Sequence, residues 1–341
     1  MNALVLSRPG ALTLRDVPPP SRPGECLIRV RMAGICGTDL QMLEGYAGFA
    51  GIPGHEFVGV VEDAPADEAS WLGKRVVGEI NVGCGRCEWC ARHEKEHCVN
   101  RSVLGIRHRD GAFAEFLSLP AANLHALPDS LDDATAVFTE PVAAACRVLE
   151  QLTLGRDWRV AVLGDGRMGL LVAQVLRTAA PDVTVLGRHE RKLAVARNLG
   201  LHTSGPLDSS IRRERFDLVV DVTGRPHGIR RALEIVRPRG LVVMKSTFHG
   251  EAPLESWPIV VDEVTLIGSR CGPFKPAIGL LESGAVQVKP LITRVAKLDD
   301  HQAAFTEARR SLKVLFGVSE TPITGPARVA ARPASGTPGA R

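Results

Sequence analysis

The chain has 341 residues, about twice the size of an average domain, which predicts two domains. Hydrophobic residues make up 45% of it, yet no apolar run is long enough to cross a bilayer and no basic leader precedes the short apolar stretch at the N-terminus. We therefore expect a cytoplasmic protein without a membrane partner. The net charge of +4 is modest, and its basic residues are interleaved with acidic ones. Together with only 4% aromatic residues, this argues against a nucleic-acid partner.

Short apolar alternations broken by glycine and proline run from Met1 to about Leu127. Examples are the stretches ECLIRVRMAG, HEFVGVVED and GKRVVGEI. This pattern is typical of strands and predicts a β-rich, barrel-like domain. Residues 131–152 then show a helical pattern, in which we expect Pro141 at a helix start or break.

Half of the eight cysteines fall in the stretch CGRCEWCARHEKEHC. Cys84, Cys87, Cys90 and Cys98 have the spacing C-x2-C-x2-C-x7-C. In a reducing compartment such closely spaced thiols are more often metal ligands than disulfides, and four of them suit a tetrahedral zinc ion. His97 is an alternative ligand, and a surface loop with incidental cysteines is the non-functional interpretation. Because all four ligands come from the protein, we expect a structural zinc that leaves no position for a substrate.

From Trp158 onward the pattern changes to strands that alternate with helices. RVAVLG, VTVLG, FDLVVDVTG, GLVVMKS and EVTLIGS are typical of buried strands, with helices predicted at RMGLLVAQVLRTAA, ERKLAVARNLG and around 229–236. This alternation predicts an α/β domain, a doubly wound parallel sheet with helices on both faces.

The first strand of this sheet leads into a glycine-rich turn that opens a helix. Gly164, Gly166 and Gly169 form G-x-G-x-x-G, with Arg167 and Met168 inside the motif. In this context the motif indicates a dinucleotide-binding loop, in which the backbone approaches the pyrophosphate at the helix N-terminus. A turn that is merely rich in glycine is the alternative interpretation.

The end of the second strand bears on the choice of cofactor. NAD sites usually place an acidic residue there, whereas this chain has Gly187 and Arg188, followed by Arg191 and Lys192. We interpret Gly187 as space for a 2′-phosphate and Arg188 as its bidentate partner, with Lys192 close by. This predicts a preference for NADP. The alternative is a solvated Arg188 and a site that accepts NAD as well.

After Ser269 the pattern is mixed, and the helical stretch HQAAFTEARRSL is too short to stand alone. We expect this part to rejoin the first domain, followed by a Pro/Gly/Ala/Arg-rich tail that is disordered. The expected division is a β-rich domain at 1–153, a dinucleotide-binding domain at 154–269, a return segment at 270–317 and the tail at 318–341.

Two further motifs lie in the first domain. GICGTDL contains Cys36 and Thr38, and GHEFVGVV contains His55 and Glu56. With the glycine loop and the four-cysteine stretch, they resemble the zinc-dependent medium-chain dehydrogenase/reductase family, which includes alcohol, polyol, threonine and glucose dehydrogenases. The resemblance extends from Met1 to about Gly317. It implies a GroES-like, β-rich catalytic domain joined to a Rossmann domain.

The resemblance also implies a second, catalytic zinc. It implies Cys36 and His55 as ligands and Glu56 as a third ligand or close partner. Glu140, in FTEPVAAA, matches a glutamate that polyol, threonine and glucose dehydrogenases place near this metal. Thr38 would take the substrate hydroxyl proton. Taken singly, Cys36 would be interpreted as a buried core thiol and Glu140 as a charge at a helix N-terminus.

These expectations combine into one function. The protein would be a zinc-dependent oxidoreductase that transfers a hydride between NADP, with NAD as the alternative, and an alcohol/carbonyl pair. Its small-molecule substrate would be a secondary alcohol, a polyol, a sugar or an amino alcohol. The alternative is a non-catalytic NADPH-binding protein that keeps the fold and the structural zinc. By analogy with relatives we expect a homo-oligomer, a dimer or tetramer.

Overall fold

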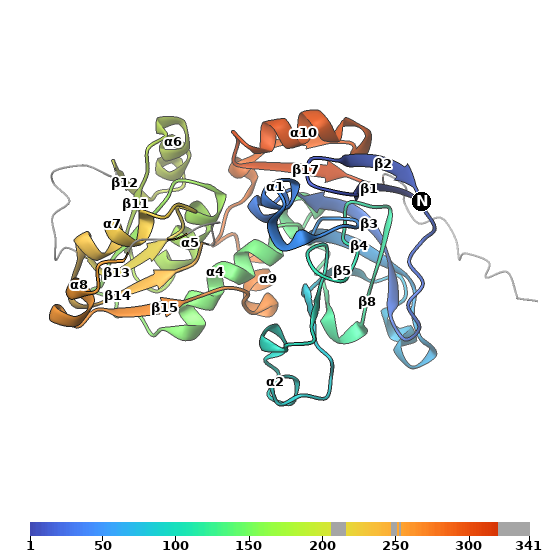
Figure 1. The fold of residues 1–341 in the computed structure, drawn as a ribbon, viewed down its shortest axis with the longest axis horizontal. Coiled ribbons are helices and arrows are strands. Elements are labelled where there is room, and N and C mark those ends of the chain that lie inside the picture. The colour runs from blue at the N-terminus through green and yellow to red at the C-terminus, as the bar shows by residue number, and fades with distance from the viewer. Residues whose placement is uncertain (206–215, 247–250, 252–253, 320–341) are drawn as a thin grey trace, which may run out of the picture.

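The computed structural model describes residues 1–205, 216–246, 251 and 254–319. Two sheets dominate it, a seven-stranded mixed sheet and a six-stranded parallel sheet. Figure 1 shows them as two bodies side by side, with helices α4 and α9 between them. The first, barrel-like body contains the chain's N-terminus, and its strands β16 and β17 come from the end of the described chain. The predicted α/β architecture with a β-rich catalytic part and a doubly wound parallel sheet is confirmed.

The seven-stranded sheet has the order β16-β17-β3-β4-β5-β9, with β8 also paired to β3. Its pairings within the β3–β4–β5–β9 portion are antiparallel, as the alternating pattern predicts. The strands of this body are β1 (Asn2–Leu6), β2 (Leu12–Asp16), β3 (Cys26–Gly34), β4 (Glu56–Asp63), β5 (Arg75–Gly78), β6 (Asn81–Val82), β7 (Ser102–Val103), β8 (Phe116–Leu119), β9 (Leu124–Ala126), β16 (Ile292–Ala296) and β17 (Lys313–Gly317). Its helices are α1 (Gly37–Leu43), α2 (Glu88–Ala91), α3 (Asp133–Ala136), α4 (Thr139–Gln151), α9 (Phe274–Glu282) and α10 (His301–Ala308).

The helical stretch predicted at 131–152 forms two helices, because helical structure is interrupted between the end of α3 and the start of α4. Pro141 lies in the first turn of α4, where a missing backbone N–H costs nothing. The sequence analysis did not predict α1 and α2, since both are short and have no apolar periodicity of their own. The helix predicted at HQAAFTEARRSL ends at Ala308, before the two arginines.

The parallel sheet has the order β12-β11-β10-β13-β14-β15, the doubly wound arrangement of a dinucleotide-binding fold. Its strands are β10 (Arg159–Leu163), β11 (Asp182–Leu186), β12 (His202–Ser204), β13 (Phe216–Asp221), β14 (Val236–Met244) and β15 (Thr265–Gly268). Its helices are α5 (Arg167–Arg177), α6 (Glu190–Asn198), α7 (Gly228–Ile235) and α8 (Trp257–Val261). The register is parallel throughout, so the carboxyl ends of all strands meet at one edge.

The alternation of side chains along β10 shows how this sheet is buried on both faces. Val160 and Val162 belong to the core shared with α4 and α5, whereas Ala161 and Leu163 belong to the core under α7. Burial on both sides explains why this strand is a continuous apolar run.

The return of the chain to the first body is visible in Figure 1, where α10 and β17 pack beside the N-terminal strands. β17 pairs antiparallel with β3, from Leu315 opposite Gly34 to Gly317 opposite Met32. Val318 and Ser319, the first residues of the predicted disordered tail, are hydrogen-bonded to Arg31 and to Val30. The rest of that predicted tail lies outside the described residues.

Candidate active site

A buried cluster of metal-ligating side chains lies where β3 and β4 pair. Gly34, the last residue of β3, is opposite Glu56, the first of β4, so Cys36 and His55 lie just beyond the paired ends. One ligand atom from each of Cys36, His55 and Glu56 lies within 4.8 Å of the other two. Two segments about twenty residues apart in sequence therefore form one three-ligand cluster. The structure brings these three predicted residues together.

Asp39 supports this cluster, and the sequence analysis missed it. Its Oδ2 accepts a hydrogen bond of 2.7 Å from the backbone N–H of Cys36, at the N-terminus of α1. Its Oδ1 lies 3.3 Å from Nδ1 of His55. Asp39 is 1% exposed and His55 3%. A carboxylate behind the far side of a ligating imidazole orients the ring and raises its basicity. The available signal was an acidic residue three positions after Cys36, where it can cap the helix.

Lys313 is the second residue that the sequence analysis missed. It is the first residue of β17, is fully buried, and forms an ion pair with Glu56 Oε2 and a hydrogen bond of 3.2 Å to the carbonyl of Ile35. Its Nζ also lies 5.6 Å from the centre of the Phe138 ring. The signal was a single lysine opening the apolar strand KVLFG, but only the pairing of β17 with β3 brings it to Glu56.

The cluster has the charge of a cation site. Glu56 Oε1 is buried and has no hydrogen-bond partner in the described structure, and the buried pair Asp39 Oδ1 and His55 Nδ1 lies 3.3 Å apart without hydrogen-bond geometry. Burial by itself would lower the pKa of His55, but the carboxylate of Asp39 and the Cys36 sulfur raise it well above its usual value. The negative charge of Asp39 and Cys36 around His55 therefore favours a positive charge in this cluster. Thiolate, imidazole and carboxylate together with unsatisfied atoms fit a zinc ion.

Thr38 and Glu140 lie next to this cluster without belonging to it. Thr38 Oγ1 is 3.9 Å from Cys36 Sγ. Glu140, in the first turn of α4, interacts electrostatically with His55, Glu56 and Lys313 but is not in the three-ligand group. Burial, which outweighs the nearby positive charges, raises the pKa of Glu140 to about 7, and Glu56 adds to the rise. Glu140 also lines a cavity of about 440 Å³ that opens beside the four-cysteine lobe.

The four predicted structural cysteines converge in that lobe, which carries α2. Ligand sulfurs of Cys84, Cys87, Cys90 and Cys98 all lie within 4.8 Å of one another. Cys87 Sγ and Cys90 Sγ are 3.6 Å apart, and the backbone N–H of Cys84 lies 3.5 Å from Cys98 Sγ. The backbone N–H of Arg86 leads in lowering the pKa of the Cys84 thiol to about 6, whereas, against the lowering effect of the backbone N–H of Cys90, burial and the neighbouring sulfurs raise the pKa of Cys87 to about 11. His97, the alternative ligand, packs against Trp89 and is not in the group.

The glycine loop follows β10 as predicted. Gly164 has a φ of +121°, which only glycine adopts without strain, and Gly166 is the N-cap of α5. A Cβ at Gly166 would meet nothing within 4 Å, so the backbone there is open to a pyrophosphate. A Cβ at Gly169 would collide with the carbonyl of Gly164, so this glycine permits close packing of α5. Met168 packs against the main core.

Arg167 connects this loop to the other body. Its Nη1 donates hydrogen bonds to the carbonyls of Ile35 (3.3 Å) and Leu312 (3.2 Å), directly before Cys36 and Lys313. Its other guanidinium nitrogen is near Gly37, where a Cβ would be 3.5 Å away. The predicted cofactor residue thus also joins the dinucleotide loop to the metal-ligand loop.

The end of β11 differs from the prediction in one respect. Gly187 does leave space, but the carboxylate of Asp165 fills it, since a Cβ at Gly187 would lie 2.5 Å from Cβ of Asp165. Asp165 accepts hydrogen bonds of 2.7 Å from the backbone N–H groups of Arg188 and His189, and one of 2.9 Å from the His189 ring. The side chain of Arg188 is exposed. Gly187 is therefore required by the glycine loop itself, which the sequence did not reveal.

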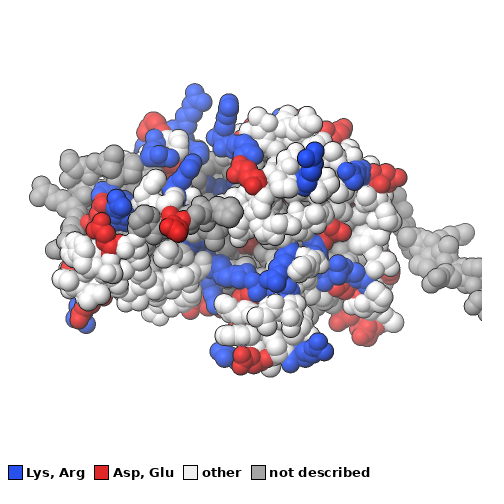
Figure 2. All heavy atoms as spheres, in the orientation of Figure 1, with Lys and Arg blue, Asp and Glu red and all other residues white. Residues whose placement is uncertain are grey.

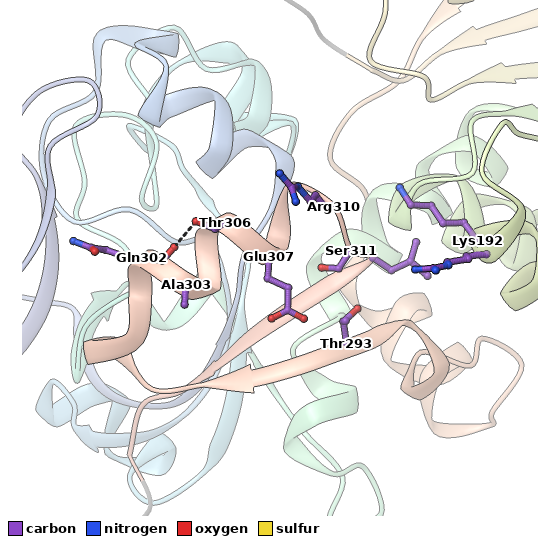
Figure 3. A pocket seen from close by; sticks show the side chains of 10 residues that line it. Lys192, Thr293, Gln302, Ala303, Thr306, Glu307, Arg310 and Ser311 are labelled. Carbon is purple, nitrogen blue, oxygen red and sulfur yellow. Dashed lines mark hydrogen bonds between the residues drawn. The ribbon is translucent and has the colours of Figure 1, made fainter.

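Lys192 lines a cavity of about 720 Å³ between α6 and the end of α10 (Figure 3). Figure 3 shows Lys192 on one side and Arg310 and Ser311 on the other. Arg191 also lines it, and Ser311 Oγ is buried without a hydrogen-bond partner in the described structure. The cavity is thus a crevice lined by basic side chains. It lies near the end of β11, between the two bodies.

Comparison with known proteins agrees with this geometry. The model of the alcohol dehydrogenase GroES-like domain matches residues 22–129, and that of the zinc-binding dehydrogenase matches residues 168–283. L-threonine 3-dehydrogenase of Streptomyces avermitilis is 34% identical, with 90% of this chain and 96% of the relative covered. Sorbitol dehydrogenase of Halalkalibacterium halodurans is 27% identical, with 93% and 99% covered.

Among solved structures, a protein of Sinorhizobium meliloti 1021 described as a zinc-binding dehydrogenase and bound to NADP is similar to this chain. It is 29% identical with a TM-score of 0.84, and the match covers 92% of this chain and 98% of that one. The chain therefore belongs to the zinc-dependent medium-chain dehydrogenase family. It is an oxidoreductase of the alcohol and polyol dehydrogenase class that uses zinc and a nicotinamide cofactor.

Proposed function

We propose that this enzyme interconverts a secondary alcohol, polyol, sugar or amino alcohol with its carbonyl form and prefers NADP over NAD. The observation that carries the proposal is the buried Cys36–His55–Glu56 cluster beside the glycine loop, tied to it through Arg167. The likeness to a threonine and a sorbitol dehydrogenase supports substrates with several polar groups. Glu140, next to the cluster, supports the same class of substrate.

When bound, zinc would supply a Lewis acid for the substrate oxygen, and the nicotinamide cofactor would supply or accept the hydride. Cys36, His55 and Glu56 would hold the metal, with Glu140 adding a carboxylate next to it. Lys313 holds one oxygen of Glu56 and leaves the other free. Thr38 Oγ1 would accept the proton of the substrate hydroxyl through a hydrogen bond.

Cys84, Cys87, Cys90 and Cys98 would hold the structural zinc, which has no open position. Gly164, Gly166 and Gly169 would receive the pyrophosphate together with Arg167 and Met168 at the start of α5. In the proposed division, residues 1–153 and 270–317 form the domain that binds the metals, and residues 154–269 form the domain that binds the cofactor.

The preference for NADP rests on the basic side chains after β11. Arg188 is exposed and forms no ion pair with a described residue, and Lys192 lines the adjacent crevice with Arg191. A bidentate contact between Arg188 and a 2′-phosphate would favour NADPH over NADH about tenfold to hundredfold. Gly187 contributes indirectly, by admitting Asp165 against the backbone of Arg188.

The experiment is a fluorescence titration of the purified protein with NADPH and with NADH. We expect NADPH to bind at least tenfold more tightly, and Arg188→Ala to abolish most of that ratio. Arg230→Ala, an exposed arginine on α7, is the matched control and should leave the ratio unchanged. Equal affinities in the wild type would contradict the preference, and no binding of either cofactor would contradict the proposed reaction.

No helix in the described part of the chain is both long and apolar enough to cross a bilayer. We further propose a cytoplasmic homo-oligomer, a dimer or tetramer, that acts on a small molecule and has neither a nucleic-acid nor a membrane partner. All eight cysteines are free thiols in the structure, which suits a reducing compartment. Light scattering would test the oligomeric state.

A further inference from the structure

Basic side chains line the cavity of Figure 3 from both bodies of the molecule. Arg191 and Lys192 come from the first turn of α6, beside the parallel sheet, and Arg310 and Ser311 come from the turn between α10 and β17. Figure 3 shows Lys192 and Arg310 on opposite sides of the cavity, and Figure 2 shows Lys and Arg on both bodies of this face. Segments far apart in the sequence therefore place three positive charges around one space of about 720 Å³.

These three cations have no counter-ion among the described residues. Arg191, Lys192 and Arg310 form neither an ion pair nor a side-chain hydrogen bond with any residue that the structure describes. Glu307 is the only acid among the described residues that line the cavity, and its carboxylate lies 3.4 Å from Nη1 of Arg294. Unpaired like charges around one space are unfavourable, so the cavity is suited to an anion.

A buried hydroxyl adds a neutral donor to the same space. Ser311 lines the cavity, and its Oγ is buried without a hydrogen-bond partner in the described part of the chain. Leaving a buried hydroxyl unpaired is unfavourable, and an oxygen atom of a ligand in the cavity would accept a hydrogen bond from it. Because phosphate oxygens accept several hydrogen bonds at once, a set of hydroxyl, ammonium and guanidinium groups fits a phosphate.

The cavity lies beside the expected position of the adenosine ribose. Leu312 also lines it, and the carbonyl of Leu312 accepts a hydrogen bond of 3.2 Å from Nη1 of Arg167, the first residue of α5 after the glycine loop. On the other side, Lys192 follows Gly187 at the end of β11 by one turn of chain and the start of α6. In a dinucleotide-binding fold the 2′-position of the adenosine ribose lies at the end of this second strand.

Neither the pyrophosphate nor the acid nearest the ribose accounts for the charge of the cavity. The pyrophosphate belongs at the glycine loop, which contributes no residue to the described lining of the cavity. Asp165 lies near the end of β11, but its carboxylate accepts hydrogen bonds from the backbone N–H groups of Arg188 and His189, and it does not line the cavity. The remaining anion of a nicotinamide cofactor is the phosphate that NADP carries on the ribose 2′-oxygen.

We propose that Arg310 is a cofactor-specificity residue that binds the 2′-phosphate of NADP from the side opposite Lys192 and Arg191, with the hydroxyl of Ser311 as a further donor. The proposal rests on the proposed function, because it takes NADP as the preferred cofactor. It goes beyond it in one respect: residues of both bodies, and not only those that follow β11, recognise the phosphate. NAD has a hydroxyl in place of this phosphate and would leave the charges of the cavity unpaired.

The test measures binding of two probes to the zinc-loaded protein by calorimetry. Adenosine 2′,5′-bisphosphate and adenosine 5′-monophosphate both represent the adenosine half of the cofactor and differ only in the 2′-phosphate. We expect the bisphosphate to bind at least tenfold more tightly, and its affinity to fall with added salt. Neither probe carries a nicotinamide, so the measurement does not depend on turnover.

Four variants connect this preference to the turn before β17. Arg310→Gln should weaken binding of the bisphosphate about tenfold, leave the monophosphate unchanged, and lower the NADPH/NADH affinity ratio by the same factor. Arg310→Lys should keep part of the preference, because it retains the charge but loses the fork of donors. Ser311→Ala should have a smaller effect in the same direction, because it removes one neutral donor.

Arg309→Gln is the matched control. The side chain of Arg309 forms an ion pair with Glu44 at 2.6 Å and does not line the cavity, so this neighbouring substitution should leave both probes unchanged. Melting curves check that each variant is folded. Arg310 is exposed and has no partner to lose among the described residues, so we expect its variants to melt with the wild type.

The outcomes separate this proposal from the proposed function. If the wild type prefers the bisphosphate and Arg310→Gln keeps that preference, or weakens both probes equally, the role of Arg310 is overturned and the preference for NADP stands. If the wild type binds both probes equally, the preference for NADP and the role of Arg310 are both overturned. If Arg310→Gln removes the preference but no alcohol reduces NADP, the role of Arg310 stands and the proposed reaction fails.

Discussion

The two cysteine-containing clusters of this enzyme contrast in how they are built. In the α2 lobe, four thiols from one continuous stretch of sequence lie close to one another, and all four candidate ligands are cysteines. At the β3–β4 junction, one thiol, one imidazole and one carboxylate come from two separate segments, and Asp39 and Lys313 flank them. The first arrangement can only hold a metal. The second keeps unsatisfied atoms and opposing charges in a buried place, which is what Lewis-acid chemistry requires.

This contrast predicts that substitutions in the two clusters affect different properties of the protein. Loss of a lobe ligand should affect the fold, because the lobe has short elements and little core of its own. Loss of support at the β3–β4 cluster should weaken metal binding or leave a buried charge unpaired, because the surrounding sheet is packed without the metal. Three variants test this comparison, and a fourth tests an ion pair outside both clusters.

The largest effect is expected for Cys98→Ser. It should remove one of two zinc ions per chain and lower the free energy of unfolding by several kcal/mol, since structural zinc contributes about 10–16 kcal/mol to small zinc-dependent folds. Metal analysis and thermal unfolding measure both quantities. Cys26→Ser, at a fully buried cysteine outside either cluster, is the control and should retain both ions. A Cys98→Ser protein with two zinc ions would show that the lobe is not a metal site.

Lys313→Met should have the next largest effect. It leaves Glu56 buried without its partner, which costs about 3–5 kcal/mol. Glu56→Gln added to Lys313→Met should recover most of that loss, because the unpaired charge is then gone. Urea unfolding of the single and double variants measures the difference. If the double variant is no more stable than Lys313→Met alone, the ion pair is not what stabilises this junction.

Asp39→Asn should act on metal affinity more than on folding. Removing the carboxylate behind His55 should weaken zinc binding at this cluster about 10–100-fold. Competition with a chelator measures the affinity, and the zinc in the α2 lobe serves as the internal control. Equal weakening of both zinc ions would point to a general loss of structure instead.

The smallest effect concerns an ion pair with no metal in it. The guanidinium of Arg109 donates two hydrogen bonds of 2.7 and 2.8 Å to the carboxylate of Glu25, and the hydroxyl of Ser118 donates a third at 2.9 Å. Burial alone would raise the pKa of Glu25, but these donors lower it below its usual value. Its stabilising effect is therefore complete above the pKa of the unfolded chain, about 4.3, and is lost as the pH falls through the lower pKa of the folded state.

Glu25→Gln tests this pH dependence. The variant should be less stable than the wild type by about 1–2 kcal/mol at neutral pH, and the difference should shrink in acid. Unfolding by urea at a series of pH values measures it. A constant difference over the acid range would show that the charge of Glu25 does not matter.

The sequence alone was sufficient for the features that have a regular local spacing. The four-cysteine lobe, the glycine loop after β10 and the strand–helix alternation of the parallel sheet could be predicted because their spacing is local. Cys36 and His55 could be identified as a pair only through the resemblance to a family, since nothing in their separation shows that β3 and β4 bring them together.

The remaining features depend on residues far apart in the chain. Lys313 reaches Glu56 because β17 returns to pair with β3, and Asp165 fills the space at Gly187 because two turns at the sheet edge meet. Arg270 donates to the carbonyl of Glu96 only because the lobe folds against the end of β15. Charge and burial act between side chains that are close in space, whatever their separation in sequence. The sequence therefore determined the chemical groups that are present, and the tertiary structure determined which of them face one another.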